Sequence, residues 1–192
     1  MSYDLVIIGG GPAGAAAAVF AARAELSTLV IDADKGFTRR AQLNNHLGFP
    51  DGITGPELVD VGRRHAEVAG AEWRQDSVTA LEASDDGLVL TTESGERIEA
   101  TDVLLATGMS AKVAEDAGIA TIDGTEPHVK TVASVDPTGR TSQAGVWAAG
   151  TVAGTTMHTV VTAGDGARVA INVISARKGE RWVDHDVLPK PE

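Results

Sequence analysis

The stretch DLVIIGGGPAG at residues 4–14 decides the fold of this chain. Its apolar run, Asp4–Ile8, stops at three glycines, as expected of a buried parallel strand that is apolar on both faces. An alanine-rich segment of good helix formers follows at Pro12–Ala22, with proline in its first turn. A second run rich in β-branched residues, at 27–31, leads to Asp32. Together these segments predict a βαβ unit with a right-handed crossover.

The glycines of this stretch form a Gly-x-Gly-x-x-Gly motif between the strand and the helix. Gly9 permits the tight turn, Gly11 lets backbone approach a pyrophosphate, and Gly14 lets the helix pack closely on the sheet. The helix N-terminus offers free N–H groups and a positive dipole end to the phosphates. Asp32 follows at a spacing of about 20 residues, where a carboxylate can accept hydrogen bonds from an adenosine ribose. The motif predicts dinucleotide binding but does not distinguish NAD from FAD.

Composition excludes several classes of function. The 192 residues contain no cysteine, which excludes disulfides, thiolate metal sites and Cys-x-x-Cys redox chemistry. The five histidines lack metal-ligand spacing, so we expect no metal site. A net charge of −11 would repel phosphate backbones, which argues against nucleic acid as a partner. Without a membrane-length apolar run or a basic leader, we expect a soluble, cytoplasmic protein that does not contact membranes.

The acidity carries a second expectation. With 27 acids against 16 bases, the chain is typical of a halophilic cytoplasm, where acids stay hydrated and salt screens their repulsion. An ordinary acidic protein remains the alternative.

Sequence periodicity predicts the remaining elements of one domain. Helices are expected at 57–68 and 163–178, and residues 109–131 read as an irregular connector. Short strands are expected at 72–81, 87–92, 97–100, 102–106 and 145–149. The first three of these strands would form a β-meander, and the last two read as buried. The predicted fold class is therefore α/β, a Rossmann-like domain with a parallel sheet plus a small β-meander.

Several segments, in order along the chain, resemble the FAD domain of thioredoxin reductases, which belong to the pyridine nucleotide-disulfide oxidoreductase family. The segments are 9–14 (GGGPAG), 45–50 (NHLGFP), 53–58 (ITGPEL), 106–108 (ATG), 145–150 (GVWAAG) and 163–167 (AGDGA). The resemblance implies FAD as the cofactor and one FAD-binding domain over 1–192. Segments 1–110 and 140–180 would form its core, and 111–139 would replace the NADPH-binding domain of the family.

The resemblance also assigns residues to the cofactor. Those expected to hold FAD are Gly9, Gly11, Pro12, Ala13, Gly14, Asp32, Asn45, Val78, Thr107, Gly108, Gly150, Thr151, His158, Thr159 and Val160. By this reading Val78 lies at the adenine, Asn45 near the isoalloxazine, and residues 158–160 at the pyrimidine edge. A helix N-terminus near Gly164 would stabilise negative charge on the reduced flavin.

The catalytic residues are unknown from sequence, and His158 is the candidate. Its ordinary pKa lies near neutrality, so it could donate a hydrogen bond or relay a proton, although simple packing beside the cofactor is an equal alternative. His46 could also approach the ring from its loop. The family's aspartate after the last strand is Thr151 here, a neutral group expected to bind ribitol less strongly than a carboxylate.

The expected function is that of an FAD-dependent oxidoreductase component of the thioredoxin-reductase-like type that does not use redox cysteines. Its electrons would come from a nicotinamide donor or from an electron-transfer protein. A non-catalytic, FAD-binding regulatory or structural subunit is the alternative, favoured by Thr151 and by the missing cysteines. Because family members dimerise through the FAD domain, the resemblance also implies a homodimer.

Overall fold

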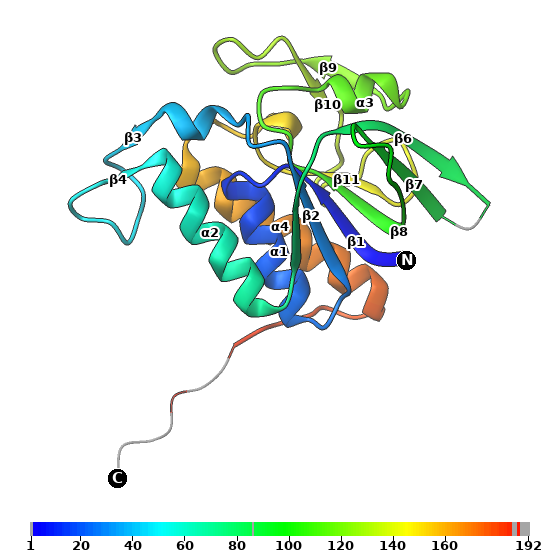
Figure 1. Ribbon diagram of the computed structural model, residues 1–192, viewed down its shortest axis with the longest axis horizontal. Helices are drawn as coiled ribbons and strands as arrows, with labels where there is room; N and C mark the ends of the chain where they lie inside the picture. Colours follow the sequence, from blue (N-terminus) through cyan, green and yellow to red (C-terminus); the bar gives the residue numbers. More distant parts are fainter. Residues whose placement is uncertain (1, 86, 186–187, 189–192) are drawn as a thin grey trace.

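The computed structural model describes residues 2–85, 87–185 and 188 (Figure 1). Two short 3-10 turns, at Phe37–Arg40 and Gly150–Ala153, accompany four helices and eleven strands in this part of the chain. The helices are α1 (Pro12–Arg23), α2 (Gly55–Ala69), α3 (Lys112–Asp116) and α4 (Thr159–Lys178). The strands are β1 (Ser2–Ile8), β2 (Thr28–Asp32), β3 (Gln42–Leu43), β4 (Ile53–Thr54), β5 (Glu72–Gln75), β6 (Val78–Ser84), β7 (Gly87–Thr92), β8 (Arg97–Leu105), β9 (Thr121–Asp123), β10 (Thr131–Ala133) and β11 (Val146–Ala148).

The central sheet has the strand order β5-β2-β1-β8-β7-β6, and β11 pairs with the carboxyl end of β8. Strands β5, β2, β1, β8 and β11 run parallel, whereas β6, β7 and β8 form an antiparallel meander. The α/β class with a parallel sheet and a small meander is therefore confirmed. Smaller antiparallel pairs, β3 with β4 and β9 with β10, flank this sheet.

The meander corrects two strand boundaries. Residues 72–81 form two strands, β5 and β6, separated at Asp76, whose N–H bonds the carbonyl of Asp32. Residues 97–100 and 102–106 were expected as separate strands but are parts of one strand, β8. Along β8 exposed and buried residues alternate up to Asp102 before the strand becomes buried on both faces, so one strand changes pattern as its neighbours change.

Alternate residues of β1 face two different cores. Leu5 and Ile7 pack with α1 and α4 on one face of the sheet. Val6 and Ile8 pack with the meander and with α3 on the other face. In Figure 1 the three long helices lie side by side on one side of the sheet, and the α3 and β9–β10 segment lies at the opposite side.

Helix α4 begins earlier than predicted. Thr159, Val160 and Val161 are β-branched and lower the local helix propensity, but Thr159 and Thr162 are buried against the rest of the molecule. Tertiary packing overrides the local preference. The expected N-terminus near Gly164 is therefore wrong, and the helix starts directly after His158.

The connector is more ordered than predicted. Helix α3 and the β9–β10 hairpin occupy it, and Ala111, Ala114 and Ile119 are buried in the meander-side core. Small apolar residues at irregular spacing gave little periodicity, which explains why the sequence did not reveal these elements. The connector is thus a packed part of the fold.

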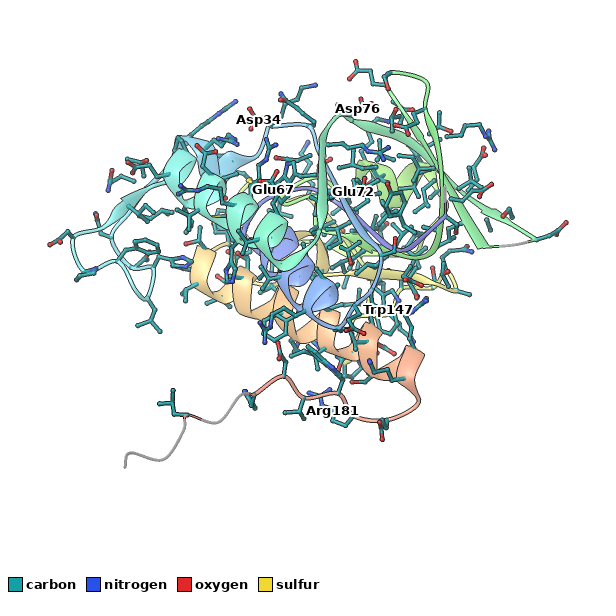
Figure 2. The ribbon with its side chains drawn as sticks, turned by 60° about the horizontal axis from the view of Figure 1, so that its bottom comes forward. Asp34, Glu67, Glu72, Asp76, Trp147 and Arg181 are labelled. Carbon is teal, nitrogen blue, oxygen red and sulfur yellow. The ribbon has the colours of Figure 1, made fainter. Side chains whose placement is uncertain are left out.

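A polar cluster of two buried side chains, Asp102 and Trp147, and the more exposed Arg177 and Asp4 anchors the C-terminal end of α4. The indole of Trp147 donates to Asp102 at 2.9 Å, and Arg177 near the end of α4 donates to the second oxygen of Asp102 at 3.1 Å. Arg177 also pairs with Asp4 on β1, and Arg140 lies 4.4 Å above the ring of Trp147. Trp147 is a core residue, as expected of the buried strand predicted at 145–149, and lies close to the end of α4 (Figure 2). The cluster ties the C-terminal end of α4 to β1, β8 and β11.

None of the helices in the described ranges is long and apolar enough to cross a membrane.

Candidate functional site

Four strand ends meet at the carboxyl edge of the parallel sheet. Gly9, just after β1, has a φ of +105°, and a Cβ there would overlap the carbonyl of Ala106 at the end of β8. A Cβ on Gly10 would lie 2.8 Å from the carboxyl carbon of Asp32, and one on Gly150 would lie 2.9 Å from the Cβ of Ala13. The ends of β1, β2, β8 and β11 are therefore in contact, at the edge where α/β sheets bind ligands.

The glycine loop opens this edge at the start of α1. Gly11 is the N-cap, with φ of −69° and ψ of −174°, and no side chain of the described residues caps the helix. A Cβ on Gly11 would meet nothing within 4 Å, whereas one on Gly14 would overlap the carbonyl oxygen of Gly9. Gly14 is thus closed against the turn and Gly11 faces open space. This arrangement exposes helix N–H groups to an anion.

Asp32 lies at the end of β2, beside the glycine loop. Its side chain is half-buried and makes no hydrogen bond with the described residues. The indole of Trp73, on β5, covers Gly10 from the same side and lies 5.9 Å from the guanidinium of Arg63. A half-buried carboxylate without a protein partner is suited to accepting hydrogen bonds from ligand hydroxyls.

The N-terminus of α4 is a second open helix end. His158 is its N-cap, and neither a side-chain cap nor an acid in the first turn is present. The imidazole of His158 is exposed and lies 3.1 Å from the hydroxyl of Thr156. The predicted group His158, Thr159 and Val160 therefore forms the start of this helix, where the dipole favours negative charge.

His46 reaches the same helix end from the loop between β3 and β4. Its Nδ1 lies 2.9 Å from the hydroxyl of Thr159, and its ring contacts Phe49 at a centroid distance of 5.8 Å. Burial lowers the pKa of His46 below its ordinary value of 6.5. The sequence made His158 the catalytic candidate. Among the described residues, however, it is His46 that hydrogen-bonds a side chain of α4, whereas His158 contacts Thr156 in the preceding loop.

Thr151 is buried at the turn after β11, and its hydroxyl makes no hydrogen bond with the described residues. The turn is held instead by Asp165 of α4, which accepts from the N–H of Gly150 at 2.7 Å and from the hydroxyl of Thr155 at 2.9 Å. Sequence reasoning missed this role, although Asp165 stands in the AGDGA segment. A polar residue in a small-residue helix start was the available signal.

Other predicted residues are less tightly connected. The hydroxyl of Thr107 donates to the carbonyl of Ser110 at 2.6 Å, and Gly108 has a φ of +64° that suits glycine. Asn45 is exposed, and Val78 is the first residue of β6, after the break between β5 and β6 at Asp76. No hydrogen bond among the described residues ties the side chain of Asn45 to the cluster around Gly11.

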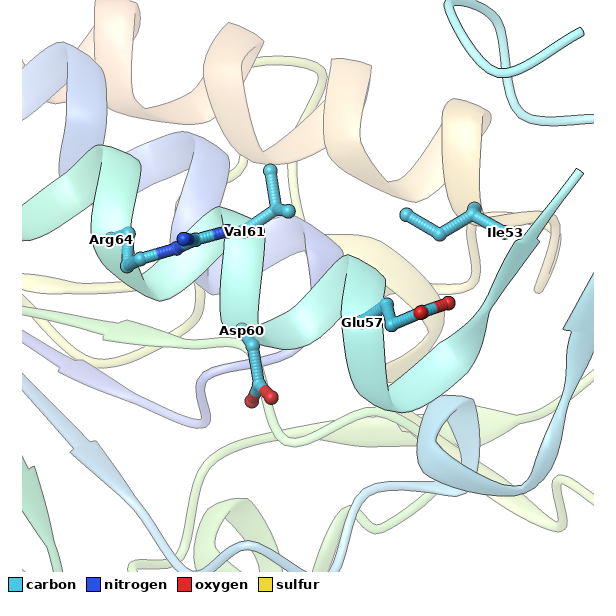
Figure 3. A pocket seen from close by; sticks show the side chains of 5 residues that line it. All are labelled: Ile53, Glu57, Asp60, Val61 and Arg64. Atoms are coloured by element: carbon cyan, nitrogen blue, oxygen red, sulfur yellow. The ribbon is translucent and has the colours of Figure 1, made fainter.

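Two hollows lie along α2. An apolar cavity of about 210 Å³ borders the site and is lined by Gly11, Pro12, His46, Phe49, Leu58 and residues near them. A wider hollow of about 620 Å³ lies on the outer flank of α2 and is lined by Ile53, Glu57, Asp60, Val61 and Arg64 (Figure 3). The wider hollow contains none of the predicted cofactor residues, so its size does not mark it as the binding site.

The residues present fit a dinucleotide that has a pyrophosphate in its middle and a second site of negative charge at one end. One open helix end, the side chain of Asp32 without a hydrogen-bond partner among the described residues, and a second open helix end share one edge of the sheet. This geometry defines a dinucleotide-binding α/β protein.

Residues 53–167 match the family model described as pyridine nucleotide-disulphide oxidoreductase, and residues 4–37 match the one described as FAD dependent oxidoreductase. Because the first match covers more than half of the chain, the chain belongs to the pyridine nucleotide-disulphide oxidoreductase family. It is a thioredoxin-reductase-like FAD-binding domain, and the prediction of FAD as cofactor is confirmed.

Curated relatives include the thioredoxin reductase of Mycolicibacterium smegmatis, 39% identical over 114 residues that cover 57% of this chain and 36% of the relative. The bifunctional thioredoxin reductase/thioredoxin of Mycobacterium leprae is 36% identical over 113 residues, covering 57% and 25%. The matched part therefore spans well under half the length of these relatives.

Solved structures share the fold. A thioredoxin reductase from Gloeobacter violaceus superposes with a TM-score of 0.83 at 19% identity, covering 98% of this chain and 99% of that chain. The atypical thioredoxin reductase TRi from Desulfovibrio vulgaris Hildenborough superposes with a TM-score of 0.75 at 25% identity, covering 92% and 98%.

Proposed function

We propose that this chain is an FAD-dependent oxidoreductase whose flavin accepts electrons from an external donor, without redox cysteines. The observation that carries the proposal is the pair of open helix N-termini, those of α1 and α4, at one sheet edge in a chain without cysteine. One end suits a pyrophosphate, and the other suits the negative charge that a flavin gains on reduction. A purely structural nucleotide site needs only the first end.

The residues would share the work as follows. The N–H groups at the start of α1 bind the pyrophosphate, and Asp32 accepts from the adenosine ribose. Thr151, whose hydroxyl has no partner among the described residues, binds the ribityl chain, and residues 158–160 face the pyrimidine edge. Bound FAD supplies reversible electron acceptance, and the dipole of α4 favours its reduced, negatively charged form.

The donor is proposed to be either a reduced nicotinamide or a small electron-transfer protein. Support for the second comes from a structural relative, the ferredoxin-flavin thioredoxin reductase from Clostridium acetobutylicum, whose name includes a protein donor. Residues 111–139, which the resemblance predicts to replace the family's nicotinamide domain, contain α3 and the β9–β10 hairpin.

A homodimer is also proposed. Val61, an exposed apolar side chain, lines the cavity between α1, α2 and the β3–β4 loop, and Leu47 and Val161 are exposed apolar side chains of the β3–β4 loop and of the start of α4. Burying such a patch against a second copy would remove apolar area from water.

The test is anaerobic spectroscopy of the purified protein in high salt, which suits its acidic composition. Flavin absorption bands that bleach on adding NADH, NADPH or reduced ferredoxin would support the proposal. Bands that bleach with dithionite but with none of these donors would favour the non-catalytic FAD-binding subunit, for which the neutral Thr151 is the specific observation. Protein that stays colourless after incubation with FAD would contradict both.

A further inference from the structure

One carboxylate of the connector reaches across to the start of α4. Glu126, half-buried between β9 and β10, accepts from the backbone N–H of Met157 at 3.0 Å and from the hydroxyl of Thr156 at 3.2 Å. Both donors belong to the loop that ends at His158, the N-cap of α4. The two bonds converge on one oxygen, Oε2, so a single side chain holds both positions.

The loop at 155–158 leads into a helix start without a side-chain cap, and side chains from other segments hold the loop in place. Thr155 at its start is bonded to Asp165 of α4, which fixes the loop only to its own helix. Glu126 is the tether that ties the loop to a different layer of the molecule, across 31 residues of sequence. Hydrogen bonds to a charged acceptor contribute more than neutral ones, and the partial burial of Glu126 strengthens this contribution.

The loop also bears on the open helix end. The hydroxyl of Thr156 lies 3.1 Å from Nδ1 of His158. The same hydroxyl donates to Glu126, so Glu126 holds the group that contacts the imidazole of His158. On the other side, His46 contacts Thr159. The start of α4 is therefore held between the connector and the β3–β4 loop, and the N–H groups of Thr159 and Val160 donate to no acceptor among the described residues.

We infer that Glu126 is a positioning residue for the flavin: it holds residues 156–158 so that the open N-terminus of α4 meets the cofactor in a fixed geometry. The inference rests on the proposed flavin site at α4. It assigns to the connector a function beyond filling the place of another domain, because the connector supplies the contact that orders the cofactor edge.

The experiment compares Glu126→Ala, Glu126→Gln and Asp123→Ala. The glutamine keeps an acceptor oxygen for both donors, and the alanine removes it. Asp123, on β9, is an exposed acid of the same connector whose side chain makes no hydrogen bond with the described residues, so its variant controls for charge and for changes to the segment.

Two readouts separate the inference from the proposed function. The first is FAD affinity, from fluorescence titration of the deflavinated protein. Glu126→Ala should raise the Kd about tenfold, Glu126→Gln by less than about threefold, and Asp123→Ala not at all. The second is amide hydrogen exchange at residues 156–161 without FAD, which should speed up in Glu126→Ala alone.

The outcomes are distinguishable. Equal FAD affinity in Glu126→Ala and Asp123→Ala would overturn the inference, as would unchanged exchange at residues 156–161. Loss of FAD binding in Glu126→Gln equal to that in Glu126→Ala would also overturn it, because the acceptor would then not matter. Wild-type protein that binds no FAD would refute the proposed site itself, while exchange would still report whether Glu126 orders the loop.

Discussion

Helix α2 begins in the opposite way to helices α1 and α4. At the start of α2, Thr54 and Glu57 form a capping box, in which Glu57 accepts from the N–H of Thr54 at 3.1 Å and the hydroxyl of Thr54 accepts from the N–H of Glu57 at 3.4 Å. The described residues provide no side-chain cap for α1 or α4, and neither has an acid in its first turn. The chain caps the start of α2 with its own side chains, and the described residues leave the starts of α1 and α4 without a side-chain cap.

The same contrast separates the glycines of the first loop. Gly14 has no room for a Cβ because the carbonyl of Gly9 occupies that space, whereas Gly11 faces open space at the helix end. Gly14 is therefore required for the packing of α1 on the glycine turn, whereas Gly11 leaves space for a ligand at the start of α1. Substitutions can test the open and the closed helix starts separately, because different residues form each of them.

The largest expected effect comes from this pair of glycines. Gly14→Ala should lower the free energy of unfolding by about 3 kcal/mol or more, because the methyl group overlaps backbone that cannot move away. Gly11→Ala should keep the free energy of unfolding within about 1 kcal/mol of wild type, since its φ of −69° suits alanine. Its FAD affinity should nevertheless fall by about 100-fold, or roughly 2.7 kcal/mol.

Chemical denaturation without FAD and fluorescence titration with FAD measure these two quantities. Each variant is a control for the other, because only one of them is expected to fold normally. Wild-type FAD affinity in Gly11→Ala would mean that the pyrophosphate does not lie at the start of α1.

These residues also show why part of the site was predictable. Gly9, Gly11, Gly14 and Asp32 follow from local chemistry, because a tight turn, a close approach and a strand-end carboxylate each leave a mark in consecutive sequence. The α/β class was confirmed by the topology of the sheet, and FAD was confirmed by the family matches. The assignments of individual residues to parts of the cofactor stay predictions.

The missed features arise from contacts across the fold. The bonds of Glu126 to Met157 and of His46 to Thr159 join segments far apart in sequence, and no periodicity or motif encodes such pairs. The start of α4 was misplaced because its β-branched first turn is stabilised by burial, which local propensity does not contain.

A smaller effect is expected at the closed end. Thr54→Ala removes the cap of α2 and should lower the free energy of unfolding by about 1 kcal/mol, measured by chemical denaturation. FAD affinity should not change, because none of the residues predicted to hold FAD lies in α2 or at its N-cap. A fall in FAD affinity comparable to that of Gly11→Ala would contradict the distinction between open and closed helix ends.

The smallest expected effect is the pH dependence of the open end of α4. Burial lowers the pKa of His46 in the folded protein below its ordinary 6.5, so the unfolded chain binds a proton more readily. The contribution is fully present above pH 6.5 and should be lost as pH falls through the lower, folded-state pKa. Charging His46 would also place a cation beside the positive end of the α4 dipole, through Thr159.

His46→Asn isolates this effect, because the amide can still bond Thr159 but does not titrate. Denaturation curves at pH 7.5 and pH 5.5 should show a smaller loss of stability on acidification in this variant than in wild type. Thr54→Ala is the matched control, since Glu57, whose pKa is lowered by its bonds to Thr54, titrates only below its ordinary value of 4.5. If His46→Asn lost as much stability as wild type between these pH values, the titrating group would lie elsewhere. A smaller loss of stability in His46→Asn than in wild type would show that the start of α4 titrates between pH 7.5 and pH 5.5, where the capped start of α2 does not.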